Sequence, residues 1–290
     1  MNKIKLSSGI ACFIIVAVLS FHSCTKDDGI ISETDISLAK DEAYSDALFQ
    51  EVDNMVTSEM SALDRNGYSS LKAAVCYTVT VDHPDSTTFP KVITIDFGDG
   101  CSTVFNGDTI TRSGKMIITN TNRWFVPGAQ HIVTFSNFYF NGVKVEGTRT
   151  MVNEGLNENN RIQTSITLED GKLTFEDDTW ISRNSSHLRE WARHQDPLKD
   201  TVWITGSADG VNKRGEEYLR EIIEPLVNVR CSEFNYRWMV SDGKIQVTNS
   251  VRGSFIIDHS GSGCSGNVTI IKDGNEYNYQ FRFRNRNGNH

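Results

Sequence analysis

From about residue 70 onward, the sequence is a succession of short runs in which β-branched or apolar residues recur at every second position. This period is typical of β-strands, and segments rich in turn-forming residues separate the runs. Helical patterns do not alternate with the runs, so the sequence predicts antiparallel strands and not an α/β fold. The predicted strands are 75–81, 92–97, 115–120, 132–140, 143–152, 162–168, 172–175, 202–207, 218–223, 236–240, 245–249, 254–258, 268–272 and 276–284.

Neighbouring runs are joined at four places by Asn or Asp followed by Gly: Asn141-Gly142, Asp170-Gly171, Asp242-Gly243 and Asp273-Gly274. Both residues of such a pair tolerate φ > 0, which a two-residue type I′ hairpin requires. We therefore expect a mainly β fold, with a large antiparallel meander or sandwich-like sheet over residues 67–290. One helical stretch is expected to interrupt it near 186–193 (SHLREWAR).

Before the sheet region, residues 36–66 have the 3.6-residue period of an amphipathic helix. Asp35 is a suitable N-cap, and Asn66-Gly67 predicts the end of the helix. Acidic residues occupy the side opposite to an apolar stripe made of Phe49, Val52, Val56, Met60 and Leu63. We expect this stripe to form core against the sheet, and a stripe that binds a partner protein is the alternative.

The first 23 residues have the pattern of a secretory signal peptide, in which two lysines precede an apolar run over 10–19. That run is too short to span a bilayer. Its position just before Cys24 resembles the lipobox of bacterial lipoproteins, although Phe21 stands where such boxes usually carry leucine. The resemblance implies that Cys24 is diacylated and anchors the mature protein to a membrane. Secretion with cleavage elsewhere is the alternative.

Residues 24–35 are predicted to form a polar tether that follows the lipid. Its beginning, Thr25-Lys26-Asp27-Asp28, resembles the Lys/acid signal that directs lipoproteins of the Bacteroidota to the outer face of the outer membrane. The resemblance implies an outer-membrane protein that faces the cell exterior. An anchor that faces the periplasm is the alternative.

The six cysteines predict two disulfide bonds. One cysteine lies in the signal peptide and Cys24 carries the lipid, so four remain in an oxidising compartment. Four cysteines allow three pairings, and their grouping along the sequence favours Cys76–Cys101 and Cys231–Cys264. The alternative is a metal site, which neither a C-x-x-C spacing nor a nearby histidine cluster supports. The sequence therefore predicts no metal and no cofactor.

Two segments that end in a cysteine are similar to each other: ITIDFGDGCS (93–102) and FIIDHSGSGCS (255–265). Each has a strand, an aspartate, a glycine turn and a cysteine. They predict two related β units, at about 70–125 and 228–286, with independent recurrence of one strand–turn solution as the alternative.

Several longer segments resemble a group of β-rich surface lipoproteins of the Bacteroidota, to which no activity is assigned. The resemblance implies the location and the β architecture, and it carries over no functional residue. The segments are ITIDFGDGC (93–101) with its repeat near the C-terminus, 135–155, 182–191 and 204–227.

For two clusters of residues, a metal-binding interpretation is weighed against a structural one. DFGDG (96–100) resembles an acidic calcium loop, but an EF-hand carries Glu at its twelfth position, where this chain has Gly107. A tight turn is therefore preferred. The second cluster lacks the H-E-x-x-H spacing of zinc hydrolases, and we interpret it as exposed polar residues of a connector. Its members are His187, Glu190, His194, Asp196 and Asp200.

The last predicted strand places three arginines on one face: Arg282, Arg284 and Arg286. They are candidates for contact with an anion or an acidic glycan, and a solvated strand face is the alternative. The tryptophans at 124, 180, 191, 203 and 238 include possible sugar-stacking platforms, although most are expected in the core or at its rim.

The net charge of −8 argues against a nucleic-acid partner, which needs a basic footprint. No nucleophile elbow, phosphate loop or dinucleotide fingerprint occurs, so no catalytic residue is predicted. The sequence thus favours a lipid-anchored, non-catalytic module for binding, adhesion or envelope structure. The alternatives are a glycan-binding or glycan-degrading component of a carbohydrate uptake system, and a handler of lipids or envelope assembly.

Overall fold

The computed structural model describes residues 31–67, 72–73, 76–85, 87–105, 108–232 and 237–280. The predicted signal peptide, Cys24 and most of the tether lie outside these residues. So do Arg282, Arg284 and Arg286.

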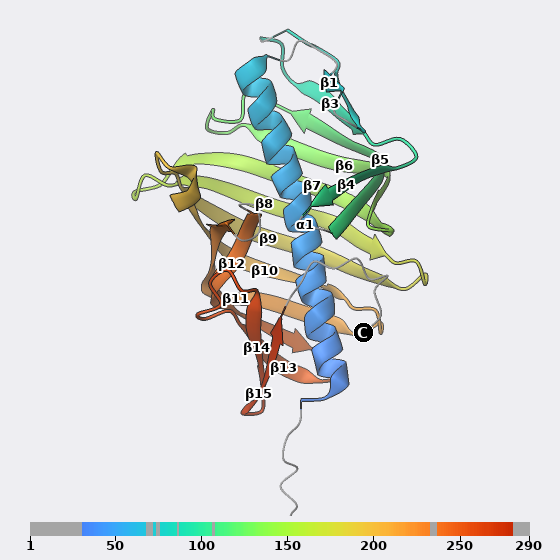
Figure 1. Cartoon of the computed structure of the whole chain (residues 1–290), viewed down its shortest axis with the longest axis vertical. Helices are drawn as coiled ribbons and strands as arrows, with labels where there is room; N and C mark the ends of the chain where they lie inside the picture. Colours follow the sequence, from blue (N-terminus) through green and yellow to red (C-terminus); the bar gives the residue numbers. More distant parts are fainter. Residues whose placement is uncertain are drawn as a thin grey trace, which may run out of the picture. The chain divides into compact units, whose positions relative to one another are not determined.

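One long helix and one antiparallel sheet make up the described chain (Figure 1). Fourteen strands follow one path through the sheet, in the order β1-β2-β3-β5 and then β6 to β15 in sequence, and β4 pairs with β5 beside this path. The predicted mainly β, antiparallel fold is confirmed. The elements are α1 (Glu33–Asn66), β1 (Lys72–Ala73), β2 (Thr78–Val81), β3 (Lys91–Asp96), β4 (Cys101–Phe105), β5 (Asp108–Asn120), β6 (Gln130–Phe140), β7 (Val143–Leu156), β8 (Ile162–Thr174), β9 (Trp180–Ala192), the short 3₁₀ helix η1 (Pro197–Lys199), β10 (Thr201–Val211), β11 (Glu217–Cys231), β12 (Arg237–Asn249), β13 (Gly253–Asp258), β14 (Asn267–Lys272) and β15 (Asn275–Gln280).

Two of the four predicted hairpin turns are β-bulges within longer strands. Asn141-Gly142 and Asp273-Gly274 do join consecutive strands, with positive φ at both residues. Asp170-Gly171 instead lies inside β8, where the pairing with β9 shifts between Leu168 and Gly171. Asp242-Gly243 lies inside β12, beside irregular pairing with β11. The two predictions were wrong because a residue that permits φ > 0 serves a bulge as well as a turn.

The helix predicted near 186–193 is also wrong, because this segment forms the second half of β9. The strand pairs with β8 on one side and with β10 on the other. Along its first half, exposed Asn184 and Ser186 alternate with buried Arg183 and Ser185. Pairing with two neighbours here overrides the helical propensity of the Leu-Arg-Glu sequence.

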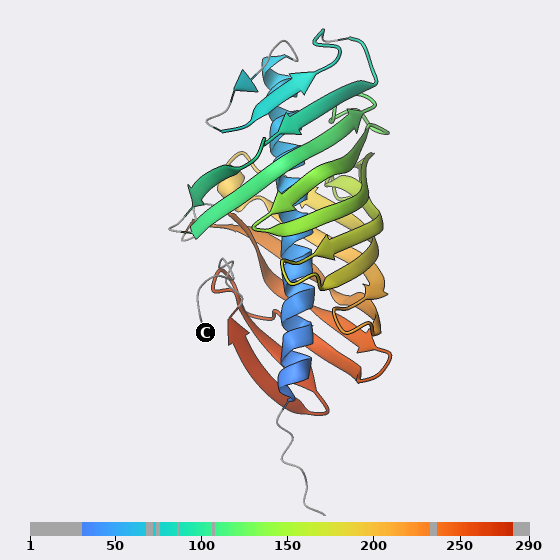
Figure 2. The same cartoon turned by 90° about the vertical axis from the view of Figure 1, so that its right-hand side faces the viewer.

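The sheet curls around α1, which lies along its inner face (Figure 2). The helix begins earlier than predicted, because the Ser32 side chain accepts a hydrogen bond from the backbone N–H of Asp35 and is the N-cap. Asp35 therefore belongs to the first turn and is not the cap. The helix ends at Asn66 as predicted, with Gly67 at φ 83°. At 34 residues, α1 is about 50 Å long.

Two apolar clusters hold α1 against the sheet. The predicted stripe of Phe49, Val52, Val56, Met60 and Leu63 is buried in the first cluster, together with residues of β2 to β9 that include Ile93, Met116 and Phe138. In the second cluster, Ile31, Leu38 and Ala39 pack on β11 to β14 through Leu226, Ile245, Val247, Phe255, Ile257, Val268 and Ile270. Apolar burial of this kind is the main driving force of the fold.

Both predicted disulfide bonds form, with Cα–Cα distances of 5.2 Å for Cys76–Cys101 and 5.6 Å for Cys231–Cys264. Cys76 precedes β2 and Cys101 begins β4, whereas Cys231 ends β11 and Cys264 lies in the turn between β13 and β14. In both turns an aspartate at the strand end accepts a backbone hydrogen bond two residues on: Asp96 from Gly98 at 2.9 Å and Asp258 from Ser260 at 2.8 Å. The two similar sequence segments therefore share the aspartate turn, which supports the turn interpretation of DFGDG, but they differ at the cysteine, which begins a strand at Cys101 and lies in a turn at Cys264.

A substitution at Gly206 of β10 tests how closely β9 and β10 approach each other. Its φ is 121°, and a Cβ atom there would lie 2.1 Å from the carbonyl oxygen of Ser186. We expect Gly206→Ala to lower the free energy of unfolding by about 2 kcal/mol or more. Urea denaturation followed by circular dichroism measures this.

The control is Gly100→Ala, because Gly100 has an ordinary φ and no atom within 4 Å of an added Cβ. A change within about 0.5 kcal/mol is expected there. Equal effects of the two substitutions would contradict the close approach of β9 and β10.

Candidate functional site

A row of ion pairs connects α1 to the sheet, and we call it the helix–sheet ladder. It places acidic side chains of α1 against basic side chains of β7, β9, β11, β14 and the β10–β11 connection. The sequence suggested that acids lie on the side of the helix away from the sheet, and for these residues that was wrong, because the sheet covers more than one side. The pairs are Asp35–Lys272, Asp41–Lys213, Glu42–Arg183, Asp46–Arg183, Asp46–Arg220 and Asp53–Arg149.

The centre of the ladder is formed by Arg183 and Arg220, whose side chains are 3% and 2% exposed. Arg183 donates to Glu42 at 2.9 Å and to Asp46 at 2.5 Å. Arg220 contacts the other oxygen of Asp46 at 2.6 Å. One carboxylate of α1 thus joins strands β9 and β11, which are not neighbours in the sheet.

The strand between them, β10, has small residues opposite the two arginines. Gly210 lies opposite Arg183, and Ala208 lies opposite Arg220. A Cβ atom on Gly210 would lie 2.0 Å from the carbonyl oxygen of Ser182. The small residues of β10 therefore leave the space in which the two arginines reach the helix.

Burial and pairing shift the pKa values of the two central carboxyls in opposite directions. Burial raises the pKa of Glu42, and the Arg183 guanidinium offsets only part of that rise. Burial acts in the same sense on Asp46, but the guanidinium groups of Arg220 and Arg183 outweigh it and hold the pKa of Asp46 below its usual value. Asp46 is therefore the ionised centre of the ladder at neutral pH.

Two histidines of the inner face are kept neutral. Burial lowers the pKa of His187 to about 3, and the nearby Arg220 acts in the same direction. Burial likewise lowers the pKa of His131 to about 3, with a smaller contribution from Arg189. His131 lies against Trp124, with 4.4 Å between the ring centroids. A proton on either imidazole would place a further cation among buried arginines.

The interpretation of the cluster around His187 as exposed residues of a connector is wrong for three members, because His187 and Glu190 belong to β9 and Asp200 is buried. The carboxylate of Asp200 accepts hydrogen bonds from the Trp191 indole at 3.2 Å and from the backbone N–H of His194 at 2.8 Å. Asp196 caps η1, and Glu190 pairs with Arg161 at 3.0 Å. Among the described residues, no group of three or more His, Cys, Asp or Glu side chains is arranged to hold a metal ion.

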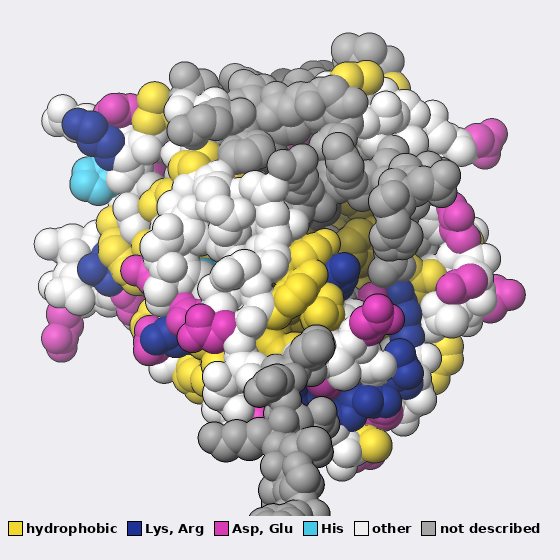
Figure 3. Space-filling model, turned by 60° about the horizontal axis from the view of Figure 1, so that its bottom comes forward, with side chains coloured by type: hydrophobic (Ala, Val, Ile, Leu, Met, Phe, Trp, Pro, Cys, Tyr) yellow, Lys and Arg dark blue, Asp and Glu magenta, His cyan; other side chains and the backbone are white. Residues whose placement is uncertain are grey.

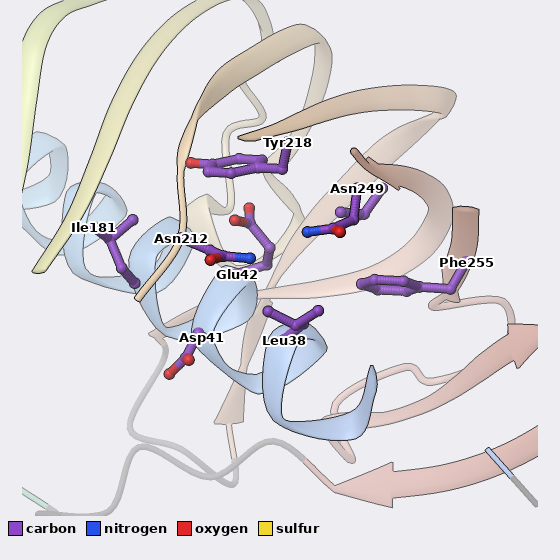
Figure 4. A pocket seen from close by; sticks show the side chains of 9 residues that line it. Leu38, Asp41, Glu42, Ile181, Asn212, Tyr218, Asn249 and Phe255 are labelled. Carbon is purple, nitrogen blue, oxygen red and sulfur yellow. The ribbon is translucent and has the colours of Figure 1, made fainter. Parts of the chain in front are cut away.

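One gap lies between the first turns of α1 and the sheet. The gap shown in Figure 4 has a volume of about 10 Å³, at the lower limit of what holds one water molecule. A larger surface recess of about 330 Å³ lies on the last two strands and is lined by Asn267, Asn278, Tyr279 and Gln280. The residues that line the inner gap are Leu38, Asp41, Glu42, Ile181, Asn212, Tyr218, Val247, Asn249 and Phe255.

The five tryptophans differ in how much of their surface is available. Trp124 is buried, and Arg161 lies 3.7 Å above the ring of Trp203. Arg230 and Arg193 lie against Trp238 and Trp191 in the same way. Trp180 is 41% exposed and is the most accessible of the five.

Two further observations concern the charged side chains of the surface and the length of the helices. On the face shown in Figure 3, basic and acidic side chains lie close to one another around apolar side chains. Within the residues that the structure describes, no helix has the length and apolar character needed to cross a bilayer.

The chain matches no protein-family model, no curated protein and no solved structure.

Arg183→Met tests the contribution of the helix–sheet ladder to stability. Removal of this guanidinium leaves Glu42 without its 2.9 Å partner and Asp46 with one partner fewer in a buried site. We expect the free energy of unfolding to fall by about 3–5 kcal/mol. Lys115→Met is the control, because the Lys115–Asp96 pair of 2.8 Å is partly exposed and is expected to contribute about 1 kcal/mol or less. Chemical denaturation measures the free energy of unfolding of both variants. Similar losses in the two would contradict a larger contribution of the buried ladder than of an exposed ion pair.

The neutral histidines predict how stability depends on pH. The pKa of His131 is about 3 in the folded protein and about 6.5 in an unfolded chain, so between these pH values only the unfolded state binds the proton. Stability is therefore expected to fall as the pH is lowered from 6.5, with His131 contributing about 1.4 kcal/mol per pH unit.

His131→Phe keeps a ring against Trp124 and should make this pH dependence shallower between pH 6.5 and 4.5. Urea denaturation at several pH values measures the slope. His83→Phe, in an exposed loop, controls for the loss of a histidine as such. If His131→Phe has the same slope as the wild-type protein, His131 is not a source of the pH dependence of stability.

Proposed function

We propose that the protein is a lipid-anchored, surface-exposed lipoprotein of the outer membrane that acts as a non-catalytic binding or structural module. The lipobox-like sequence before Cys24 and the Lys/acid segment after it support the anchor and its outward direction. The described part of the chain begins at Ile31, which packs in the second apolar cluster, seven positions after Cys24.

The main support for a non-catalytic role is that acidic side chains of α1 are ion-paired to arginines of the sheet. Asp46, Asp53 and Glu42 are all ion-paired to arginines of the sheet. A glycosidase needs two carboxyls that reach a substrate bond, one of them able to give up a proton. The buried acids of this protein are committed to structure, so they support a binding or structural role over a hydrolytic one.

Lipid handling has less support. A lipid carrier needs an apolar cavity of several hundred Å³. Helix α1 occupies the inner face of the sheet, and the gap beside it measures about 10 Å³. A ligand of the described part would therefore bind at the outer face or at an edge of the sheet.

Cys24→Ala tests the anchor. We expect the wild-type protein in the membrane fraction and the variant in the soluble fraction after cell lysis, because the variant lacks the thiol that carries the acyl chains. Cys12→Ala is a matched control, since Cys12 lies in the predicted signal peptide and should leave fractionation unchanged. Retention of Cys24→Ala in the membrane would overturn the lipoprotein assignment.

The outward orientation is tested by protease treatment of intact cells. Digestion of the wild-type protein before the outer membrane is permeabilised is the expected result. Protection until permeabilisation would indicate a periplasm-facing anchor instead.

A further inference from the structure

A row of side chains crosses four strands of the outer face, on the side of the sheet away from α1. Cross-strand pairing places Tyr139 of β6 opposite Lys144 of β7, Lys144 opposite Thr174 of β8, and Thr174 opposite Trp180 of β9. We call these four residues the outer row. The next residues along the same strands point inward and are buried: Phe140, Val143, Leu173 and Ile181.

The two ends of the outer row are exposed aromatic rings. Tyr139 is 38% exposed and Trp180 is 41% exposed. Three strand-to-strand steps separate them, which corresponds to about 14 Å, or roughly three pyranose rings of an extended chain. The side chains between them, Lys144 and Thr174, are polar. Lys144 pairs with Glu146 at 2.8 Å.

The ring of Trp180 has a polar neighbour as well as open surface. Lys172 lies opposite Ser182 on the same face, and its Nζ atom is 5.3 Å from the centroid of the Trp180 ring. The outer row thus combines two aromatic faces with ammonium, hydroxyl and carboxylate groups. Such a combination fits a ligand with both C–H faces and hydroxyl groups.

We propose that the outer row binds an extended, neutral glycan chain, which runs across the strands from Tyr139 to Trp180. The rings stack on the C–H faces of two sugar units, and the polar side chains between them exchange hydrogen bonds with hydroxyl groups. This assignment rests on the proposed binding role and names its ligand class.

The local charges favour a neutral glycan over a polyanion. Lys144 and Lys172 lie in or beside the outer row, but Glu146 pairs with Lys144. The turn before Trp180 adds the exposed acids Glu176, Asp177 and Asp178. A polyanion would meet more negative than positive charge at this place.

A protein partner fits this surface less well than a sugar chain does. Stable protein interfaces bury about 800 Å² on each partner around an apolar centre. The centre of the outer row is instead occupied by Lys144 and Thr174, and its aromatic rings are at the two ends. A narrow ligand that touches both rings and leaves the centre polar matches this arrangement.

The test uses the full-length protein in detergent and three neutral probes: cellohexaose, mannohexaose and the hexamer of N-acetylglucosamine. Isothermal titration calorimetry is expected to detect binding of at least one probe. Trp180→Ala and Tyr139→Ala should each weaken that binding about tenfold or more, because each removes one stacking surface. Tyr277→Ala is the matched control, since Tyr277 is also 38% exposed but lies on β15, outside the outer row.

Three results would overturn the inference. These are no binding of any neutral hexamer, binding that Trp180→Ala leaves unchanged, and binding of a galacturonate hexamer in preference to all neutral probes. Circular dichroism and urea denaturation establish that the variants are folded. Membrane fractionation of Cys24→Ala does not depend on the outer row, so failure of glycan binding and failure of the anchor are distinguishable.

Discussion

The contact of Asp46 with Arg183 and Arg220 is the interaction on which the arrangement of helix and sheet depends. A buried carboxylate is tolerated only when cations and hydrogen-bond donors surround it, so the helix can settle only where both arginines reach it. The apolar stripe already fixes which side of α1 faces the sheet. The ladder adds a directional requirement at several points along the helix, and it thereby selects one position of α1 against the sheet.

The curvature of the sheet follows from the same requirement. Strands of 11 to 15 residues from β6 to β12 can wrap around a helix only if they bend, and bulges such as those at Asp170-Gly171 and Asp242-Gly243 supply the bends. The small residues of β10 allow arginines from its two neighbours to cross the space beneath the helix. As a result the inner face is occupied by the chain itself, and the outer face and the edges are left for partners.

The sequence predicted the features that have a local signature. Alternation identified most strands, the three- and four-residue steps from Phe49 to Leu63 identified the buried side of α1, and cysteine grouping identified both disulfide bonds. Features that depend on distant neighbours were missed. An Asp-Gly pair has the same local preferences in a turn and in a bulge, and SHLREW is a strand because β8 and β10 flank it. The pairing of Asp46 with residues 137 and 174 positions away left no signal in the helix sequence, and neither did the outer row, which exists only through strand register.

The position of α1 at the beginning of the folded chain has a consequence for how the protein is made. The helix is synthesised before the sheet, yet its ionic partners are distributed from Arg149 to Lys272. Until the last strands emerge, its acids have no cations to meet and its apolar stripe has no complete sheet to cover it. Such dependence on contacts between distant parts of the chain is typical of slow folding. The growing polypeptide therefore passes through a period in which the helix lacks its partners, and the last ion pair of the ladder forms only once Lys272 of β14 has been made.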